Sequence, residues 1–157
     1  MARSLLQDPA GGGTHLVLYD GVCGLCNRLL QFVLAHDRRA VFAFASLQSP
    51  IGRSTVERFG GNPDELSSFC VVSHFRTDRA RMVGRGRAAL FVAGELGWPW
   101  KAAVLFRVVP TAILNRGYDV VARNRYRLFG RLDRCPMTRP EYRRRFIDGE
   151  LRGGGLP

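Results

Sequence analysis

Two spacings of apolar and polar residues run along this chain, and together they predict a mixed α/β fold. Short apolar runs bounded by polar or glycine residues are typical of buried strands, whereas apolar residues repeated every three to four positions are typical of amphipathic helices. The short runs predict strands at residues 15–19, 40–45, 69–72 and 80–83. The helical spacing predicts a first helix that covers residues 27–37 and begins near residue 23, and further helices over residues 51–59 and over residues 88–96 before Gly97.

The order of these elements predicts how the sheet is paired. A strand, a helix and a second strand favour parallel pairing through a right-handed crossover. The polar, turn-like residues 74–78 between the next two strands predict an antiparallel hairpin. This order, βαβ followed by a β-hairpin and a helix, is the thioredoxin-like arrangement.

The last third of the chain adds helices to this arrangement. Residues 101–109 are apolar apart from Lys101 and Arg107, residues 111–127 have helical spacing, and a basic helix is expected over residues 139–147. We therefore expect an α/β fold with extra C-terminal helices. A chain of 157 residues suits one domain. We assign that domain to residues 15–148, between flexible tails at residues 1–14 and 149–157.

Composition is typical of a soluble protein, with 46% apolar and 24% charged residues. No run approaches the roughly 18 apolar residues of a membrane-spanning helix. Residues 1–14 lack the apolar stretch of an export signal. We expect a cytoplasmic protein.

The net charge of +11 favours acidic partners, such as nucleic acid or an anionic lipid surface. All basic residues except Lys101 are arginine, a choice that a compositional bias of the genome explains equally well. The sequence contains no recognised nucleic-acid-binding motif, so we expect no specific nucleic-acid partner. Weak association with an anionic membrane surface stays open.

Cys23 and Cys26 are the candidate reactive residues, because they lie where the first strand gives way to the first helix. A helix N-terminus carries a partial positive charge of about half a unit, which stabilises a thiolate. We expect Cys23 to lie at or just before the first turn, partly exposed, as the nucleophile. Cys26, one turn further along, would be the resolving thiol.

This cysteine pair has two other interpretations. A zinc site needs about four ligands, usually from two close pairs. The other candidates stand singly in the sequence: Cys70, Cys135, His15, His36 and His74. We therefore expect neither a metal nor another cofactor, while a non-catalytic remnant of a redox site stays open.

Asp20, three residues before Cys23, has two interpretations. Its carboxyl group could exchange a proton with Cys26 if an apolar pocket raised its pKa. Alternatively, it is a turn residue whose carboxylate accepts backbone N–H groups. Further along, Asn124, Arg125 and Tyr126 favour a structural role over substrate contact, and Cys135 is expected on a loop away from the pair.

The chain resembles the DCC family of thiol-disulfide oxidoreductases, named for an Asp-x-x-Cys-x-x-Cys signature. The signature here is Asp20 to Cys26, followed by Asn27. Residues 42–48 and 118–130 also match the family, Cys135 fits its late cysteine, and the resemblance covers about residues 15–147. It implies thiol–disulfide exchange as the activity.

Two functions follow. The first is an enzyme that exchanges disulfides through Cys23 and Cys26, with Asp20 assisting, on a protein or small-molecule disulfide or dithiol substrate. Its electron donor is not specified by the sequence. The alternative is a non-catalytic thioredoxin-like module that binds an anionic membrane surface or a protein partner through its arginine-rich C-terminal helices.

Overall fold

The computed structural model describes residues 14–64, 69–131 and 140–148. Apart from Thr14, the two predicted tails lie outside the described residues, and so does Cys135.

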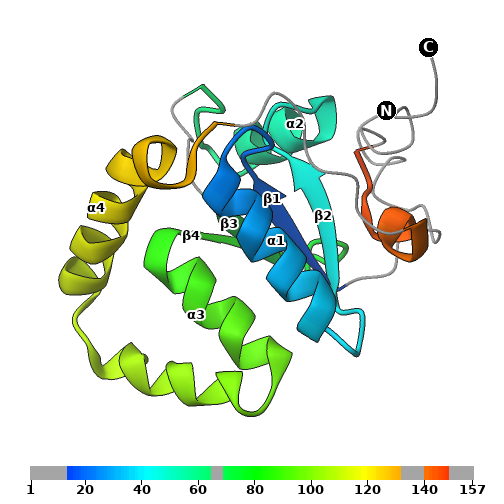
Figure 1. Cartoon of the computed structure of the whole chain (residues 1–157). Coiled ribbons are helices and arrows are strands. Elements are labelled where there is room, and N and C mark those ends of the chain that lie inside the picture. Colours follow the sequence, from blue (N-terminus) through cyan, green and yellow to red (C-terminus); the bar gives the residue numbers. More distant parts are fainter. Residues whose placement is uncertain (1–13, 65–68, 132–139, 149–157) are drawn as a thin grey trace.

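A four-stranded sheet forms the centre of the molecule, in the order β2-β1-β3-β4 (Figure 1). Strand β1 (His15–Tyr19) pairs in parallel with β2 (Phe42–Ser46) and antiparallel with β3 (Cys70–Ser73). Strand β4 (Arg81–Gly84) closes the hairpin with β3. The thioredoxin-like order predicted from the sequence is therefore confirmed, with strand ends shifted by one or two residues.

Both faces of the sheet are covered, which explains why β1 is apolar at nearly every position. Successive side chains of a strand point to opposite faces. Val17 and Tyr19 belong to the core beneath α1 (Gly24–His36) and α3 (Arg85–Leu96). Leu16 and Leu18 belong to the core beneath α2 (Pro50–Arg58).

The additional helices lie beside this sandwich rather than over the sheet (Figure 1). After α3 ends at Gly97, which has a positive φ of 83°, the chain forms the 3-10 helix η1 (Trp100–Val108) and then α4 (Thr111–Phe129). No residue of η1 is buried, and Arg125 is the buried residue of α4. In the part of the chain that the structure describes, no helix is both long and apolar enough to span a bilayer.

The C-terminal segment packs against the edge of the sheet at β2. The expected basic helix is the short 3-10 helix η2 (Pro140–Arg145), and Ile147 N–H then donates to the Phe44 carbonyl at 3.0 Å. Phe146 is buried against the rings of Tyr19 and Phe44. This edge of the sheet is therefore covered, which protects its backbone groups from pairing with other chains.

Candidate functional site

The cysteine pair lies at the N-terminus of α1, as predicted. Cys23 is the residue that caps the helix, with an extended backbone (φ −86°, ψ 120°), and Cys26 lies in the first turn. The Asn27 side chain holds this turn in shape, because its Nδ2 donates to the carbonyl oxygens of Gly21 at 3.1 Å and Cys23 at 3.0 Å. The residue that follows the cysteine signature thus fixes the geometry of the signature itself.

The two sulfur atoms are close enough to hydrogen-bond to each other. Burial raises the pKa of the Cys26 thiol to about 12, and the neighbouring Cys23 raises it further in the same direction. A hydrogen bond with the backbone of Asp20 and the charge of Arg125 act in the opposite direction, with smaller effect. Cys26 is therefore a protonated thiol at neutral pH.

The expectation that Cys23 is partly exposed is wrong, because its exposed fraction is 0%. The end of α4 lies over it. Arg131 pairs with Cys23 in an isolated antiparallel bridge, and Gly24 N–H donates to the Gly130 carbonyl at 3.3 Å. We call residues 129–131 the α4 cover. Its position depends on a contact between segments about a hundred residues apart, which local patterns do not reveal.

Gly24 makes this close approach of the α4 cover feasible. A Cβ atom at Gly24 would lie 2.2 Å from the carbonyl oxygen of Phe129, a separation that real Cβ atoms do not adopt. The glycine between the two cysteines is therefore required by the packing of α4 against α1.

Asp20 is buried among four hydrogen-bond donors. Its Oδ1 accepts from Gln48 Nε2 at 2.8 Å and from Val22 N–H at 3.1 Å. Its Oδ2 accepts from the Tyr126 hydroxyl at 2.6 Å and from Arg125 Nη2 at 3.2 Å. The bond from Val22 is the turn contact that one interpretation predicted. The surroundings are polar rather than the apolar pocket that the acid–base interpretation assumed.

Arg125 and Tyr126 form one unit with Asp20. Arg125 Nη2 also donates to the Tyr126 hydroxyl oxygen at 2.9 Å, and its guanidinium lies 4.6 Å from the centre of the Tyr126 ring. Burial, followed by the hydrogen bond to Asp20 and its charge, raises the pKa of Tyr126. Burial alone would lower the pKa of Arg125, but contact with Tyr126, Cys23 and Asp20 outweighs it and raises that pKa.

Asn124, Arg125 and Tyr126 were predicted to have a structural role, and two of them, Arg125 and Tyr126, hold α4 against the site. Asn124 does not join them, because its Nδ2 donates to the Val120 carbonyl within α4 at 2.9 Å. Gln48 was not singled out as a site residue, although it links the site to the end of β2. Besides donating to Asp20, it accepts from Gly21 N–H at 3.2 Å. The sequence did contain one signal for these site residues: residues 42–48, which include Gln48, and residues 118–130 match the DCC family.

Cys70 is separate from this site. It lies buried in β3, and burial raises the pKa of its thiol to about 12. It is a small core residue. Within residues 14–64, 69–131 and 140–148, no three His, Cys, Asp or Glu side chains gather in a way that could hold a metal ion.

The sheet order and a cysteine pair at the N-terminus of α1 define a thioredoxin-like α/β protein. Residues 17–131 match the model of the DCC1-like thiol-disulfide oxidoreductase family, and the chain belongs to that family.

Two relatives each match most of this chain. The chain is 33% identical over 133 residues to YuxK, an uncharacterised protein of Bacillus subtilis, covering 85% of this chain and 93% of the relative. It is 35% identical over 123 residues to a chloroplastic DCC family protein of Arabidopsis thaliana, covering 78% of this chain and 69% of the relative. No solved structure matches this chain.

Proposed function

We propose that this protein exchanges disulfides through Cys23 and Cys26, with Cys23 as the attacking thiolate. The observation that carries the proposal is the contact between the two sulfur atoms at the N-terminus of α1. Family membership supports a thiol–disulfide role in general. The assignment to these two residues rests on their geometry.

The two thiols are distinguished by their surroundings. Cys26, with a pKa of about 12, is a poor nucleophile at neutral pH. Cys23 caps α1, where the helix carries partial positive charge, and it interacts electrostatically with Arg125. The Nε of Arg125 is buried and has no hydrogen-bond partner among the described residues, so it is a donor suited to a sulfur anion.

The proposed reaction proceeds in two exchanges. The Cys23 thiolate attacks one sulfur of a substrate disulfide, whose S–S bond breaks, and the other substrate sulfur leaves as a thiolate that takes up a proton. Cys26 then loses its proton and attacks the Cys23 sulfur, which releases the second substrate thiol. The substrate gains two electrons and two protons, and the protein is left with a Cys23–Cys26 disulfide that an external dithiol must reduce.

The buried state of Cys23 adds one requirement. A substrate disulfide reaches the sulfur only when the α4 cover moves away from the N-terminus of α1. This movement would break the backbone contacts of residues 130 and 131 with Gly24 and Cys23. It would also break the hydrogen bonds from α4 to Asp20. We propose that Asp20 controls this opening. Once α4 has moved and its two donors have left Asp20, this carboxylate accepts the Cys26 proton during the second exchange. The reaction would take place in a reducing compartment such as the cytoplasm.

The test is reduction of a small disulfide, hydroxyethyl disulfide, with dithiothreitol as the electron donor. Cys23→Ser should abolish the protein-dependent rate. Cys26→Ser should trap a mixed disulfide on Cys23, visible by mass spectrometry. Cys70→Ser is the matched control, because it removes a thiol that lies outside the site, and it should retain the rate. A native rate that survives in Cys23→Ser would refute the proposal.

A second candidate function is binding to an anionic membrane surface. It is favoured by the exposure of η1 and its flanks, where the exposed fraction reaches 83% at Trp98 and 87% at Val108. Lys101 and Arg107 lie in the same segment, and apolar residues mixed with cations suit an anionic bilayer.

Vesicle sedimentation tests this second candidate. The chain should bind vesicles that contain phosphatidylserine, lose that binding in high salt, and bind phosphatidylcholine vesicles weakly. The double variant Phe106→Ser/Val108→Ser should weaken it. Equal binding by this double variant would exclude η1 as the contact surface.

A further inference from the structure

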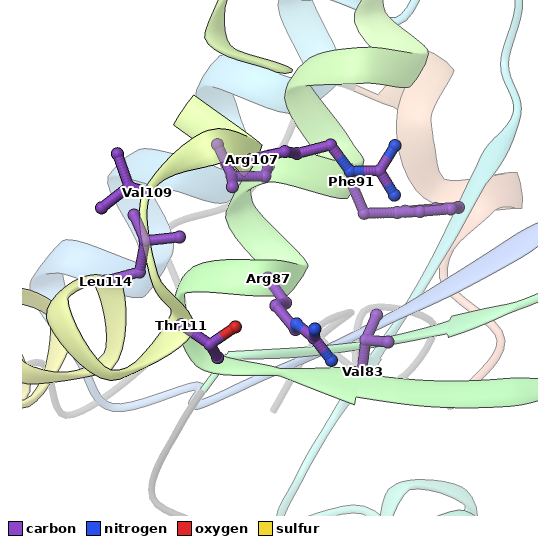
Figure 2. Close-up of a pocket in the computed structure, with 8 residues that line it drawn as sticks. Val83, Arg87, Phe91, Arg107, Val109, Thr111 and Leu114 are labelled. Atoms are coloured by element: carbon purple, nitrogen blue, oxygen red, sulfur yellow. The ribbon is translucent and has the colours of Figure 1, made fainter. Parts of the chain in front are cut away.

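A hollow lies away from the cysteines, near the beginning of α4 (Figure 2). Its volume is about 290 Å³, and it opens between α3, the end of η1 and the beginning of α4, with β4 below. This volume lies just below the usual range of small-molecule pockets, which is about 300–1,000 Å³. Its occupant would therefore be a small molecule rather than a peptide.

Five of the eight residues that line this cavity are apolar. Leu90 and Phe91 belong to α3, and Figure 2 shows Phe91 across the cavity from Val109 and Leu114. These side chains come from both packed helices and from the segment between η1 and α4, so they would enclose an apolar body on more than one side. Such walls favour a hydrocarbon or aromatic group over a fully polar ligand.

Two arginines give the cavity its charge. In Figure 2 the Arg107 side chain reaches toward Phe91, and the Arg87 side chain reaches toward Val83. No acidic residue is among the described residues that line the cavity. The cavity therefore presents two cations that no carboxylate of its own wall balances.

Neighbouring acidic residues are already engaged elsewhere. Asp119 of α4 lies 3.8 Å from Arg85, and Glu95 of α3 lies 3.3 Å from Arg39. Neither Arg87 nor Arg107 has an ion pair within the described ranges. Guanidinium groups bind carboxylate and phosphate oxygens with two parallel hydrogen bonds, so an anion from outside would satisfy them.

The start of α4 adds to the same electrostatic field. Thr111, the first residue of this 19-residue helix, lines the cavity, and the first turn of α4 contains no acidic residue. The partial positive charge of a helix N-terminus therefore acts in the same direction as the two guanidinium groups.

We propose that this cavity binds a small amphipathic anion, with its carboxylate or phosphate head between Arg87 and Arg107 and its apolar body against Phe91 and Leu114. The site is independent of the disulfide chemistry proposed above, and it requires neither cysteine.

Isothermal titration with octanoate tests the proposal, with 1-octanol and acetate as ligands that lack the head or the body. Octanoate should bind, and the other two should bind at least about tenfold more weakly. Arg87→Gln and Arg107→Gln should each weaken octanoate binding about tenfold. Octyl phosphate in place of octanoate then distinguishes a phosphate site from a carboxylate site.

Arg123→Gln is the matched control, because it removes the same charge from an exposed position of α4 outside the cavity. It should change octanoate affinity less than twofold. Three results would overturn the proposal: no octanoate binding, equal binding of 1-octanol, or a loss in Arg123→Gln as large as in the cavity variants. A normal circular dichroism spectrum for each variant shows that the fold is retained.

Discussion

Asp20 connects three separate parts of the chain through a single carboxylate. Gln48 reaches it from the end of β2, Val22 from the turn before α1, and Arg125 and Tyr126 from α4. The ion pair with Arg125 is almost completely buried, with both side chains 4% exposed. Removing one partner of a buried pair leaves the other charge uncompensated, which costs far more than loss of a surface pair.

Asp20→Asn is therefore expected to loosen the α4 cover. With the asparagine carbonyl facing Gln48 and Val22, its NH₂ group would face Arg125, which is also a donor. We expect a loss of about 3 kcal/mol in the free energy of unfolding, and faster alkylation of Cys23 by iodoacetamide. Urea unfolding and mass spectrometry measure the two effects.

Tyr126→Phe is a milder variant, because it removes two hydrogen bonds, the one donated to Asp20 and the one accepted from Arg125, and leaves the charges in place. We expect it to lower the free energy of unfolding by about 2 kcal/mol, about 1 kcal/mol for each bond. If Asp20→Asn changes neither stability nor alkylation, the carboxylate does not hold the cover. If alkylation of Cys23 accelerates while disulfide exchange slows, Asp20 has a part in the chemistry as well.

Cys26 and Cys70 should make the fold less stable in alkaline solution. Burial raises the pKa of each thiol to about 12, above the value near 8.5 of an unfolded cysteine. The folded state thus retains protons that the unfolded state loses, and stability falls as the pH rises from about 9 toward 12. Over this pH range, each thiol lowers the free energy of unfolding by at most about 1.4 kcal/mol for each pH unit.

Urea unfolding at pH 8.0 and 10.0, in the presence of a reductant, measures this loss. Cys70→Ala should show a smaller decrease between the two pH values than the native chain, because one of the two thiols is gone. The raised pKa of Tyr126 acts in the same direction at higher pH. An equal decrease in both proteins would contradict the assignment to Cys70.

At the scale of elements, the site depends on how α4 meets α1. Gly24→Ala should separate them, because the added Cβ would meet the Phe129 carbonyl at 2.2 Å. We expect a loss of about 1–3 kcal/mol in stability and a marked increase in Cys23 alkylation. Gly117→Ala is the matched control in α4, where a Cβ would meet nothing within 4 Å.

The control should be neutral or stabilising by up to about 1 kcal/mol, because alanine favours a helix interior. Its Cys23 should remain as slow to react as in the native chain. If Gly24→Ala and Gly117→Ala alkylate at the same rate, close packing at Gly24 is not what protects the sulfur.

Elements with a strong local pattern were predictable from sequence. Strand β1 was predicted at its observed bounds, because it is apolar on both faces, and α3 was predicted to end before Gly97. The start of α1 at the cysteines followed from the strand that precedes them. Such features depend on a few consecutive residues.

Features that depend on distant segments were not predictable. Tyr126 and Asp20 are 106 positions apart, and nothing near either residue indicates the other. The same is true of the cover over Cys23, which made its expected exposure wrong. Only the resemblance to a family linked residues 20–26, 42–48 and 118–130, and it did so without giving their contacts.

For the whole molecule, the C-terminal segment completes the domain at β2. The buried Arg145 pairs with Asp37 at the end of α1, donates from Nε to the Phe42 carbonyl at 2.9 Å, and stacks over the Phe44 ring. Asp37 also accepts from the backbone N–H of Phe42 at 3.0 Å. One side chain thus joins η2, α1 and β2.

Arg145→Ala should therefore weaken the whole fold rather than free a tail. We expect a loss of about 3 kcal/mol, because Asp37 stays buried without its cation but keeps its backbone donors. Urea unfolding should remain a single transition with a lower midpoint. Arg144→Ala, which removes the same charge from an exposed neighbour, should stay within about 0.5 kcal/mol of the native chain. If Arg145→Ala instead gives two transitions, with the main midpoint unchanged, η2 is an independent attachment and the domain ends before it.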